Sequence, residues 1–421
     1  MNLIAVGVNH KTAPIEIREQ LWLSIPESKQ LLTSLVEGGI VAEAVVISTC
    51  NRTELFAVPK LVEADADFFK RFLIEHKGAR KEVKTEHFFS LFACGAAKHF
   101  FEVAAATDSM IIGDAQILGQ VKDAYRLAAE AGATGTVLNH LCHAAFAASK
   151  RVRSETELTD GAVSISYAAV ELARKIFSDL SSKHILIIGA GETAELAAKH
   201  LIDKNAAQIS ITNRTPENAV ALSERLNTAC GIVPFAAFAA ELHKFDIVIS
   251  AVSNAGTVVS AAELDAAMRL RQNKAMLVLD IGLPRNIDPN AAELYNVFLK
   301  DIDDLNIIVG KNLERRRAEL PKVAVIVEEE LIAFERWHHA LQAVPTIKQL
   351  QEKFNEIKTT ELEKLKGRVS GETYLQMELF ADRLIKKILH YPMQNLKLQT
   401  GVEQDLVGKL SLIRSIFNLE E

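Results

Sequence analysis

The stretch His184-Ile185-Leu186-Ile187-Ile188-Gly189-Ala190-Gly191-Glu192-Thr193-Ala194 decides the fold of the middle of this chain. Its apolar first half predicts a strand, and the rest predicts a turn that enters a helix at about Glu192. Gly189 permits the tight turn, and Gly191 lets backbone N–H groups approach a pyrophosphate at the helix N-terminus. Ala194 stands where a third glycine is often found. We therefore predict a dinucleotide site formed by Gly189, Ala190, Gly191, Glu192, Thr193 and Ala194.

The end of the next predicted strand, Gln208–Thr212, indicates which dinucleotide binds. An NAD enzyme usually places Asp or Glu there for the ribose hydroxyls, whereas this chain has Asn213, Arg214 and Thr215. Arg214 can pair with a 2′-phosphate, and its two neighbours add neutral hydrogen-bonding groups. This pattern favours NADPH. The alternative is that Arg214 is an ordinary solvated arginine in a turn.

Residues 159–310 alternate strands with helices throughout. Beyond the two strands above, three more apolar runs are strand candidates: Asp246–Ala251, Met276–Asp280 and Val297–Lys300. Such alternation is typical of a doubly wound parallel sheet, so we predict a Rossmann-type domain over this range.

Residues 1–158 predict a smaller α+β domain with helices on one face of its sheet. The expected strands are Leu3–Val8, Ala44–Ser48 and Leu55–Val58, and the expected helices are Glu27–Val36 and Ala64–His76. Beyond about residue 95 the pattern becomes helical.

Residues 311–421 show no strand pattern. Apolar residues recur every three or four positions from Leu320 to Leu341, with Pro321 predicted to kink this helix or to begin a new one. Further amphipathic stripes follow to Phe417. Helices of this kind usually form a bundle that a partner chain completes.

The composition excludes several classes of protein. Of 421 residues, 49% are hydrophobic and 24% charged, and the net charge of −6 argues against a strongly basic nucleic-acid binder. No apolar run reaches the roughly 18 residues of a membrane span, and the N-terminus resembles a strand rather than an export signal. Four cysteines without a CxxC pair argue against a disulfide framework or a metal site, and they fit a cytoplasmic protein.

The run Ser48-Thr49-Cys50-Asn51-Arg52-Thr53-Glu54 carries the strongest sign of chemistry. It follows an apolar strand, so Cys50 is expected at a strand end, where a thiol can attack a carbonyl group. Arg52 offers positive charge nearby and a fork for a carboxylate. The other cysteines, Cys94, Cys142 and Cys230, have apolar surroundings and are expected in the core.

Two histidines are candidate general acids. His99 lies in a helical stretch and would ordinarily be a satisfied edge residue, while His10 lies at the end of the first predicted strand and can reach the same cleft. Gln116 and Gln120 are four residues apart and share a helix face, either as plain surface or to recognise a small polar substrate.

These segments together resemble the glutamyl-tRNA reductase family. The matching pieces are collinear and include GVNHKTAP at 7–14, STCNRTE at 48–54, DSMIIGDAQILGQVKDAY at 108–125, GAGETAELAAKHL at 189–201 and DIGLPRNI at 280–287. The resemblance covers the first three quarters of the chain with specific motifs. The helical tail is similar to that family's dimerisation domain in length and pattern.

The resemblance implies roles for particular residues. Cys50 would be the nucleophile and His99 a histidine important for activity. The glutamyl group would be bound by Thr49, Asn51, Arg52, Ser109, Asp114, Ala115, Gln116 and Gln120. It also implies NADPH-dependent reduction of glutamyl-tRNA to glutamate-1-semialdehyde through a thioester, as the start of the five-carbon route to tetrapyrroles. This chain departs from the family in having Asp114 where Glu is typical, and Ala106-Thr107 where Gly-Leu is frequent.

Two rival interpretations remain. A shikimate-type dehydrogenase shares the glycine turn and the Asn-Arg-Thr run, but only over residues 160–310. A non-catalytic regulator would bind NADPH or tRNA without turnover. The basic runs Arg315–Arg317 and Lys386–Lys387 are either tRNA contacts or solvated faces, and hand-off of the reactive aldehyde to an aminomutase is plausible chemistry.

Overall fold

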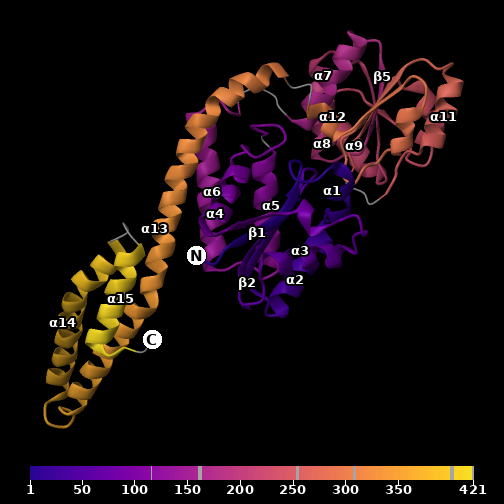
Figure 1. The fold of residues 1–421 in the computed structure, drawn as a ribbon. Coiled ribbons are helices and arrows are strands. Elements are labelled where there is room, and N and C mark those ends of the chain that lie inside the picture. Colours follow the sequence, from indigo (N-terminus) through magenta and orange to yellow (C-terminus); the bar gives the residue numbers. More distant parts are fainter. Residues whose placement is uncertain (115, 160–163, 253–255, 307–309, 399–402, 420–421) are drawn as a thin grey trace. The chain divides into compact units, whose positions relative to one another are not determined.

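The computed structural model describes residues 1–114, 116–159, 164–252, 256–306, 310–398 and 403–419 (Figure 1). The chain divides into two compact units, residues 2–328 and residues 329–421. Within the described residues, the first unit contains a four-stranded sheet and a six-stranded sheet. The second unit is helical.

The four-stranded sheet is antiparallel and has the order β2-β3-β1-β4. Its strands are β1 (Ile4–Asn9), β2 (Val41–Ser48), β3 (Arg52–Pro59) and β4 (Phe89–Phe92). The three predicted strands are confirmed. The sequence analysis missed β4, which is only four residues long and has no fully buried residue.

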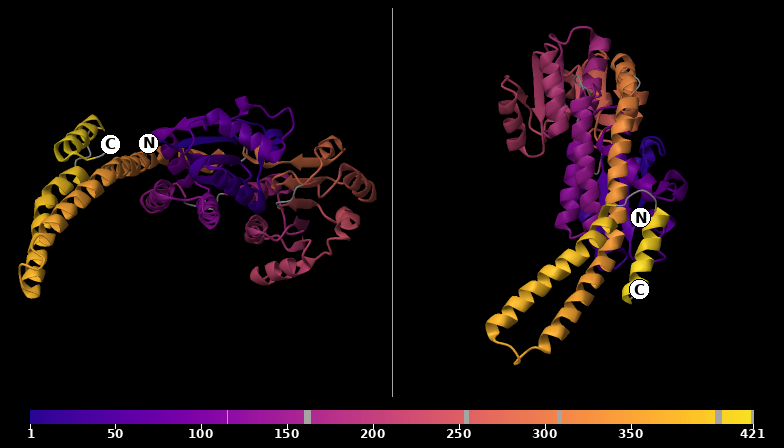
Figure 2. Two further views of the ribbon diagram at one scale, coloured as in Figure 1. Left: turned by 90° about the horizontal axis from the view of Figure 1, so that it is seen from below. Right: turned by 90° about the vertical axis from the view of Figure 1, so that its left-hand side faces the viewer.

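Helices cover this sheet on both sides, so the expectation of helices on one face is wrong (Figure 2). All six residues of β1 are buried, whereas a sheet with one open face would expose every second residue. The helical elements of this domain are α1 (Ile15–Leu21), α2 (Ile25–Glu37), α3 (Ala66–Lys77), η1 (Thr85–His87), α4 (Ala93–Ala104), α5 (Ile117–Glu130) and α6 (Thr136–Glu155).

The six-stranded sheet is parallel throughout and has the order β10-β9-β8-β5-β6-β7. This is the Rossmann order, in which the chain starts in the middle and winds outward to both edges. Its strands are β5 (His184–Ile188), β6 (Gln208–Thr212), β7 (Gly231–Ile232), β8 (Ile247–Ser250), β9 (Met276–Asp280) and β10 (Val297–Lys300). The five predicted strands are confirmed, and only the two-residue β7 was missed.

Two apolar layers enclose this sheet, as the doubly wound prediction requires. Ile185 and Ile187 of β5 lie in one buried cluster, while Leu186 and Ile188 lie in another. Successive side chains of a strand point to opposite faces, so both faces are packed. The covering elements are α7 (Ile165–Phe177), α8 (Glu192–Asp203), α9 (Pro216–Arg225), α10 (Phe238–Glu241), η2 (Leu242–Lys244), α11 (Ala261–Leu270), η3 (Pro289–Glu293) and α12 (Ile302–Asn306).

The C-terminal helices are α13 (Gly310–Glu363), α14 (Gly371–Leu398) and α15 (Glu403–Phe417). Pro321 lies inside α13, so the prediction that it begins a new helix is wrong. A proline removes one backbone hydrogen bond, and the many remaining bonds of a 54-residue helix carry it past that position. Among the described residues, no helix is long and apolar enough to cross a membrane.

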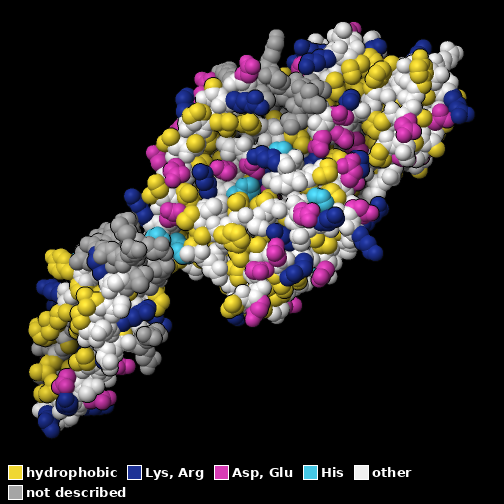
Figure 3. Space-filling model, in the orientation of Figure 1, with side chains coloured by type: hydrophobic (Ala, Val, Ile, Leu, Met, Phe, Trp, Pro, Cys, Tyr) yellow, Lys and Arg dark blue, Asp and Glu magenta, His cyan; other side chains and the backbone are white. Residues whose placement is uncertain are grey.

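Apolar side chains remain exposed on these helices, and Figure 3 shows hydrophobic side chains gathered over α14. The exposed members on α14 are Leu375, Met377, Leu379, Phe380, Leu384, Ile388 and Tyr391. Exposed apolar patches of this kind mark interaction surfaces.

Candidate active site

The Cys50 loop, residues 49–51, joins β2 to β3 and is held by backbone hydrogen bonds. Thr49 N–H donates to the Arg52 carbonyl at 2.8 Å, and His10 N–H donates to the Asn51 carbonyl at 3.0 Å. Asn51 N–H donates to the Thr49 hydroxyl at 3.2 Å. The loop therefore places the half-buried Cys50 at the end of the sheet, as predicted from the strand pattern.

A cavity of about 460 Å³ lies beside this loop. It is lined by every predicted substrate residue that the structure describes: Thr49, Asn51, Arg52, Ser109, Asp114, Gln116 and Gln120, together with Cys50. Ala115 lies outside the described residues. The Ser109 hydroxyl is buried and has no hydrogen-bond partner among the described residues, so it is available to a ligand.

Burial, with a smaller contribution from the charge of Asp114, raises the pKa of the Cys50 thiol to about 11. The guanidinium groups of Arg18 and Arg52 act in the opposite direction but are outweighed. Arg52 therefore favours the thiolate, as expected, yet the resting thiol keeps its proton at neutral pH.

Arg52 lies in a buried ion cluster with Glu54, His99 and Asp108. Its Nη1 donates to Glu54 Oε1 at 2.7 Å and to Asp108 Oδ2 at 3.2 Å, and its Nη2 donates to the Asp108 carbonyl oxygen. His99 Nε2 lies 3.0 Å from Glu54 Oε2. The Arg52 fork is thus already bonded to two internal carboxylates, which would compete with a substrate carboxylate.

The charges of the cluster support one another. Burial alone would lower the pKa of His99, but the Glu54 carboxylate outweighs it and the pKa is raised. Burial alone would raise the pKa of Glu54, but Arg52 and His99 outweigh it and the pKa is lowered. The cluster therefore favours a charged pair between Glu54 and His99.

Ligand atoms of Glu54, His99 and Asp108 lie within 4.8 Å of one another, a spacing that suits a metal ion. The Arg52 guanidinium already bonds both carboxylates, so it supplies the positive charge that these groups need. A metal ion is not required to explain the cluster.

Neither of the candidate histidines, His99 and His10, is among the described residues that line the cavity beside Cys50. Burial lowers the pKa of His10 to about 4, and its Nδ1 is buried without a hydrogen-bond partner among the described residues. His10 is therefore neutral, and His99 is better placed to hold Glu54 than to donate a proton to substrate.

Arg18 of α1, which was not predicted from the sequence, is 1% exposed. Its Nη1 donates to the Cys50 carbonyl at 3.1 Å and lies 3.4 Å from Asn51 Oδ1, and its Nη2 pairs with Asp303 of α12. An arginine among the apolar and acidic residues of a short helix gives no sign of such a contact. Glu54 and Asp108 were also not predicted, although both stand inside the quoted motifs.

A second cavity, also of about 460 Å³, lies at the N-terminus of α8. Its lining includes Ala190, Gly191, Glu192, Thr193, Asn213, Arg214 and Thr215, as predicted, together with Asn218 and Phe235, which the sequence analysis missed. Gly191 is the N-cap residue of α8, so backbone N–H groups face this cavity. The exposed Arg214 stands at its edge, free to meet a phosphate.

Gly189 and Ala194 shape the turn rather than line the cavity. Gly189 has φ 118°, and a Cβ there would lie 2.8 Å from the Ala251 carbonyl oxygen, so only glycine fits. Ala194 is fully buried against the sheet. The turn between β5 and α8 is therefore tight enough for its backbone to approach a pyrophosphate closely.

The two cavities share three lining residues: Thr193, Ala251 and Val252. Cys50 lines one cavity and Gly191 lines the other, so the two cavities are neighbours. Ile281, Gly282 and Leu283, which follow β9, also line the cavity at Cys50.

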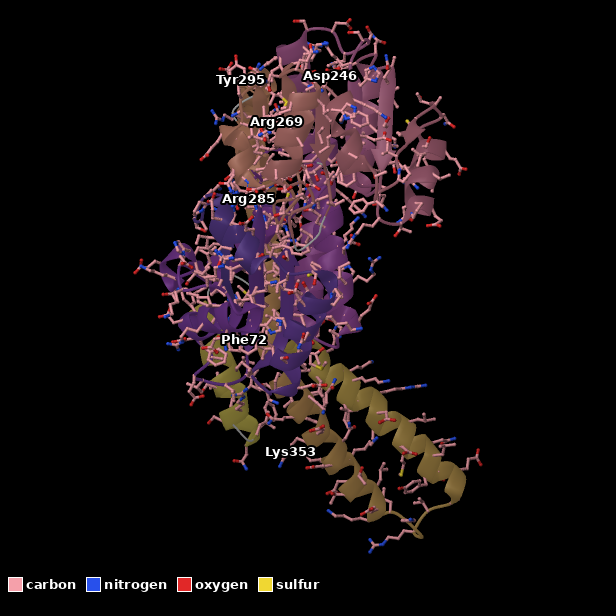
Figure 4. The ribbon with its side chains drawn as sticks, turned by 90° about the vertical axis from the view of Figure 1, so that its right-hand side faces the viewer. Phe72, Asp246, Arg269, Arg285, Tyr295 and Lys353 are labelled. Atoms are coloured by element: carbon pink, nitrogen blue, oxygen red, sulfur yellow. The ribbon has the colours of Figure 1, made fainter. Side chains whose placement is uncertain are left out.

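A polar network fixes the loop after β9. Asp280 accepts backbone N–H bonds from Gly282, Asn286 and Ile287 at 3.2, 2.7 and 2.8 Å. In the same loop, Arg285 (labelled in Figure 4) pairs with Glu19 of α1 through Nε and Nη2, both at 3.0 Å. The quoted motif at 280–287 thus shapes the cavity and contacts the domain that carries Cys50.

An Asp114→Asn variant should have a more reactive Cys50 thiol. Burial raises the pKa of Asp114 to about 6, so it is ionised at pH 8, where its charge opposes the thiolate. The amide removes that charge but keeps an oxygen that can accept the Gln116 N–H, which in the unmodified protein donates to Asp114 Oδ1 at 3.0 Å. We expect alkylation by iodoacetamide at pH 8 to be about two- to tenfold faster. Equal or slower alkylation would contradict this electrostatic account.

Comparisons with known proteins agree along the whole chain. Residues 6–156 match the family model "Glutamyl-tRNAGlu reductase, N-terminal domain", residues 171–308 match "Shikimate / quinate 5-dehydrogenase", and residues 322–419 match "Glutamyl-tRNAGlu reductase, dimerisation domain". The shikimate-type match is confined to the Rossmann domain, as the sequence analysis anticipated.

Full-length relatives resolve that ambiguity. Proteins named glutamyl-tRNA reductase from Chlorobium phaeobacteroides and Chlorobaculum parvum are 55% and 54% identical over 421 residues, which is 100% of this chain and 99% of each relative. The solved structure of glutamyl-tRNA reductase from Methanopyrus kandleri is 30% identical with a TM-score of 0.52, covering 99% of both chains. On this similarity, the chain belongs to the glutamyl-tRNA reductase family of oxidoreductases.

Proposed function

We propose that this enzyme reduces glutamyl-tRNA to glutamate-1-semialdehyde with NADPH, through a thioester on Cys50. The reaction would open the five-carbon route to tetrapyrroles. The observation that carries the proposal is that the two cavities are neighbours and share the lining residues Thr193, Ala251 and Val252. It allows a dinucleotide seated at the α8 N-terminus to present its reactive end at Cys50.

The first step is acyl transfer to sulfur. The Cys50 sulfur attacks the ester carbonyl of the glutamyl group, the carbon–oxygen bond to the tRNA breaks, and the thiol proton ends on the departing tRNA hydroxyl. Asp114 and the Ser109 hydroxyl line the same cavity and are positioned to hold the polar groups of the glutamyl moiety. The high thiol pKa means that substrate binding must assist loss of the proton.

The second step is reduction of the thioester. NADPH, when bound, supplies a hydride to the thioester carbonyl carbon. The resulting tetrahedral oxyanion takes up one proton to give a hemithioacetal, whose carbon–sulfur bond then breaks to release the aldehyde and the Cys50 thiol. The thioester is more easily reduced than the original ester, which gives the covalent step its purpose. The apolar residues Ile281 and Leu283 help to keep water from the thioester.

The residues present fit NADPH better than NADH. The turn at Gly189 is too narrow for any Cβ, Gly191 caps α8, and Arg214 is exposed at the cavity edge without a carboxylate in the adjacent Asn213 and Thr215. A guanidinium at this place suits a 2′-phosphate.

An Arg214→Ala variant should bind NADPH about ten- to a hundredfold more weakly, because one charge-assisted contact to phosphate contributes about 1.5–3 kcal/mol. Binding of NADH should change less than about twofold. Titration of nicotinamide fluorescence with each cofactor measures both affinities. Arg225→Ala, an exposed arginine of the same domain that pairs with Glu195, is the matched control. Equal losses for the two cofactors would remove the 2′-phosphate assignment.

The family match to a dimerisation domain and the exposed apolar side chains of α14 support a homodimer formed through the C-terminal helices. We further propose that the acceptor end of the tRNA enters the cavity at Cys50. Arg316 is 2% exposed and donates to the Ile112 carbonyl at 2.8 Å, so the expectation that it contacts tRNA or lies on a solvated face is wrong. Contacts of Arg317 or Lys386–Lys387 with the tRNA body, hand-off of the aldehyde to an aminomutase and a cytoplasmic location remain parts of this proposal.

Incubation of the protein with glutamyl-tRNA, with and without NADPH, tests the proposed function directly. We expect a protein-bound glutamyl thioester without NADPH and glutamate-1-semialdehyde with it. Shikimate-dependent formation of NADPH would instead support the dehydrogenase interpretation. Binding of both ligands without thioester or aldehyde would support the non-catalytic regulator.

A further inference from the structure

We propose that Arg18 is a positioning residue that fixes the Cys50 loop to the Rossmann domain through Asp303, and so aligns the thioester for reduction. The inference rests on the proposed thioester mechanism and adds a residue that this mechanism does not itself require. Three observations carry it: the two arms of the Arg18 guanidinium, the rigidity of the helix that holds Asp303, and the packing of Cys50.

The two arms of Arg18 bond different domains. Nη1 donates to the Cys50 carbonyl at 3.1 Å and to Asn51 Oδ1 at 3.4 Å, while Nη2 pairs with the Asp303 carboxylate. Nε donates to the Ala13 carbonyl at 3.2 Å, which fixes the guanidinium on α1 itself. Because a guanidinium is planar, a shift of one arm moves the other.

Asp303 is a firm anchor because α12 is locked into the Rossmann domain. Ile302 and Leu305 on either side of it are fully buried in that domain's apolar cluster. Asp301 caps the helix by accepting the N–H groups of Asp303 and Asp304 at 3.0 and 3.1 Å. The Asp303 carboxylate is therefore held in a fixed position relative to the rest of the Rossmann domain.

Cys50 itself packs against the same apolar cluster, which contains Ile281. Met110 and Ile111 of the domain that carries Cys50 also belong to this cluster, so the Cys50 side chain packs where the two domains meet. The Cys50 carbonyl is bonded to Arg18, so both the side chain and the backbone of the residue are held. A loosened Arg18–Asp303 pair should leave the sulfur able to accept the acyl group but less well aligned for hydride transfer.

An Asp303→Asn variant isolates the interdomain arm, because it leaves every bond from Arg18 to the Cys50 loop in place. Without NADPH, the burst of glutamyl thioester on Cys50 should stay within about twofold of the unmodified enzyme. With NADPH, the ratio of semialdehyde to glutamate lost by hydrolysis of the thioester should fall about tenfold, as expected for about 1.4 kcal/mol of lost alignment.

Two further variants complete the test. Arg18→Lys keeps the charge but loses the fork, so it should slow the thioester burst about tenfold and also lower the ratio. Glu16→Gln is the matched control: it is the same acid-to-amide change, on α1, at an exposed pair 3.2 Å from Arg285. It should alter neither quantity, because exposed ion pairs contribute little.

The outcomes are distinct. An unchanged ratio in Asp303→Asn, or an equal fall in Glu16→Gln, would overturn the inference even if Arg18→Lys fails to fold. Semialdehyde formation by the unmodified enzyme without any acylated Cys50 would instead overturn the proposed function.

Discussion

A Cys50→Ser variant should fold and bind NADPH normally but make semialdehyde at least about a thousandfold more slowly. The cavity disfavours an anion at this position, since burial and Asp114 raise the pKa of the thiol to about 11. A serine hydroxyl loses its proton far less readily than a thiol, so it cannot replace the sulfur. Production of semialdehyde from glutamyl-tRNA and NADPH measures the effect.

Cys94→Ser is the matched control for this variant. Cys94 is exposed at the start of α4 and does not line the Cys50 cavity, so we expect nearly full activity. Turnover of Cys50→Ser above about a tenth of the original rate would exclude sulfur as the nucleophile, because loss of an essential nucleophile costs far more.

A Glu54→Gln variant should lose about 3 kcal/mol or more of the free energy of unfolding. Glu54 is fully buried and bonds Arg52 at 2.7 Å and His99 at 3.0 Å, so the amide leaves two cations in the core with one carboxylate fewer. Urea unfolding followed by circular dichroism measures the change. Asp67→Asn removes an exposed ion pair with Lys70 and should have no measurable effect.

The same variant should change how stability depends on pH. Glu54 outweighs burial and raises the pKa of His99 above 6.5, so this stabilisation is complete below pH 6.5 and is lost as pH rises through the folded pKa. The Glu54 pKa is lowered below 4.5, so its contribution is complete above pH 4.5 and is lost as pH falls through the folded pKa. Glu54→Gln should flatten both declines. An unchanged profile would show that the pair does not couple to folding.

Much of the fold could be predicted because its strands are continuous apolar runs ended by turn residues. His184–Ile188 and Met276–Asp280 coincide with β5 and β9 for this reason. The elements that were missed are short, and β4 is partly exposed while both residues of β7 are exposed, so their residues leave no periodic signal. Of the two alternatives for Pro321, a new helix is wrong, because the cost of a proline is local whereas the length of α13 depends on the whole helix.

The lining of the two cavities could be predicted where it comes from short continuous runs of sequence, as at residues 49–52 and 190–193. The candidate site was not predictable where contacts join distant parts of the chain, as between Arg18 and Asp303, which are 285 residues apart. The burial of the cysteines also could not be inferred from their apolar sequence neighbours. Cys142 is buried as expected, but Cys230 is half-buried and Cys94 is exposed, so the expectation for these two is wrong. Arg52 bonds an internal carboxylate instead of remaining free for a substrate carboxylate, and this too depends on a distant residue, Asp108, 56 positions away.

The most direct test is mass spectrometry of the peptide containing Cys50 after the enzyme has been mixed with glutamyl-tRNA without NADPH and quenched in acid. The account predicts a glutamyl group on that sulfur, which disappears as semialdehyde forms when NADPH is added. Semialdehyde accumulating at the full rate while this peptide stays unmodified would contradict it.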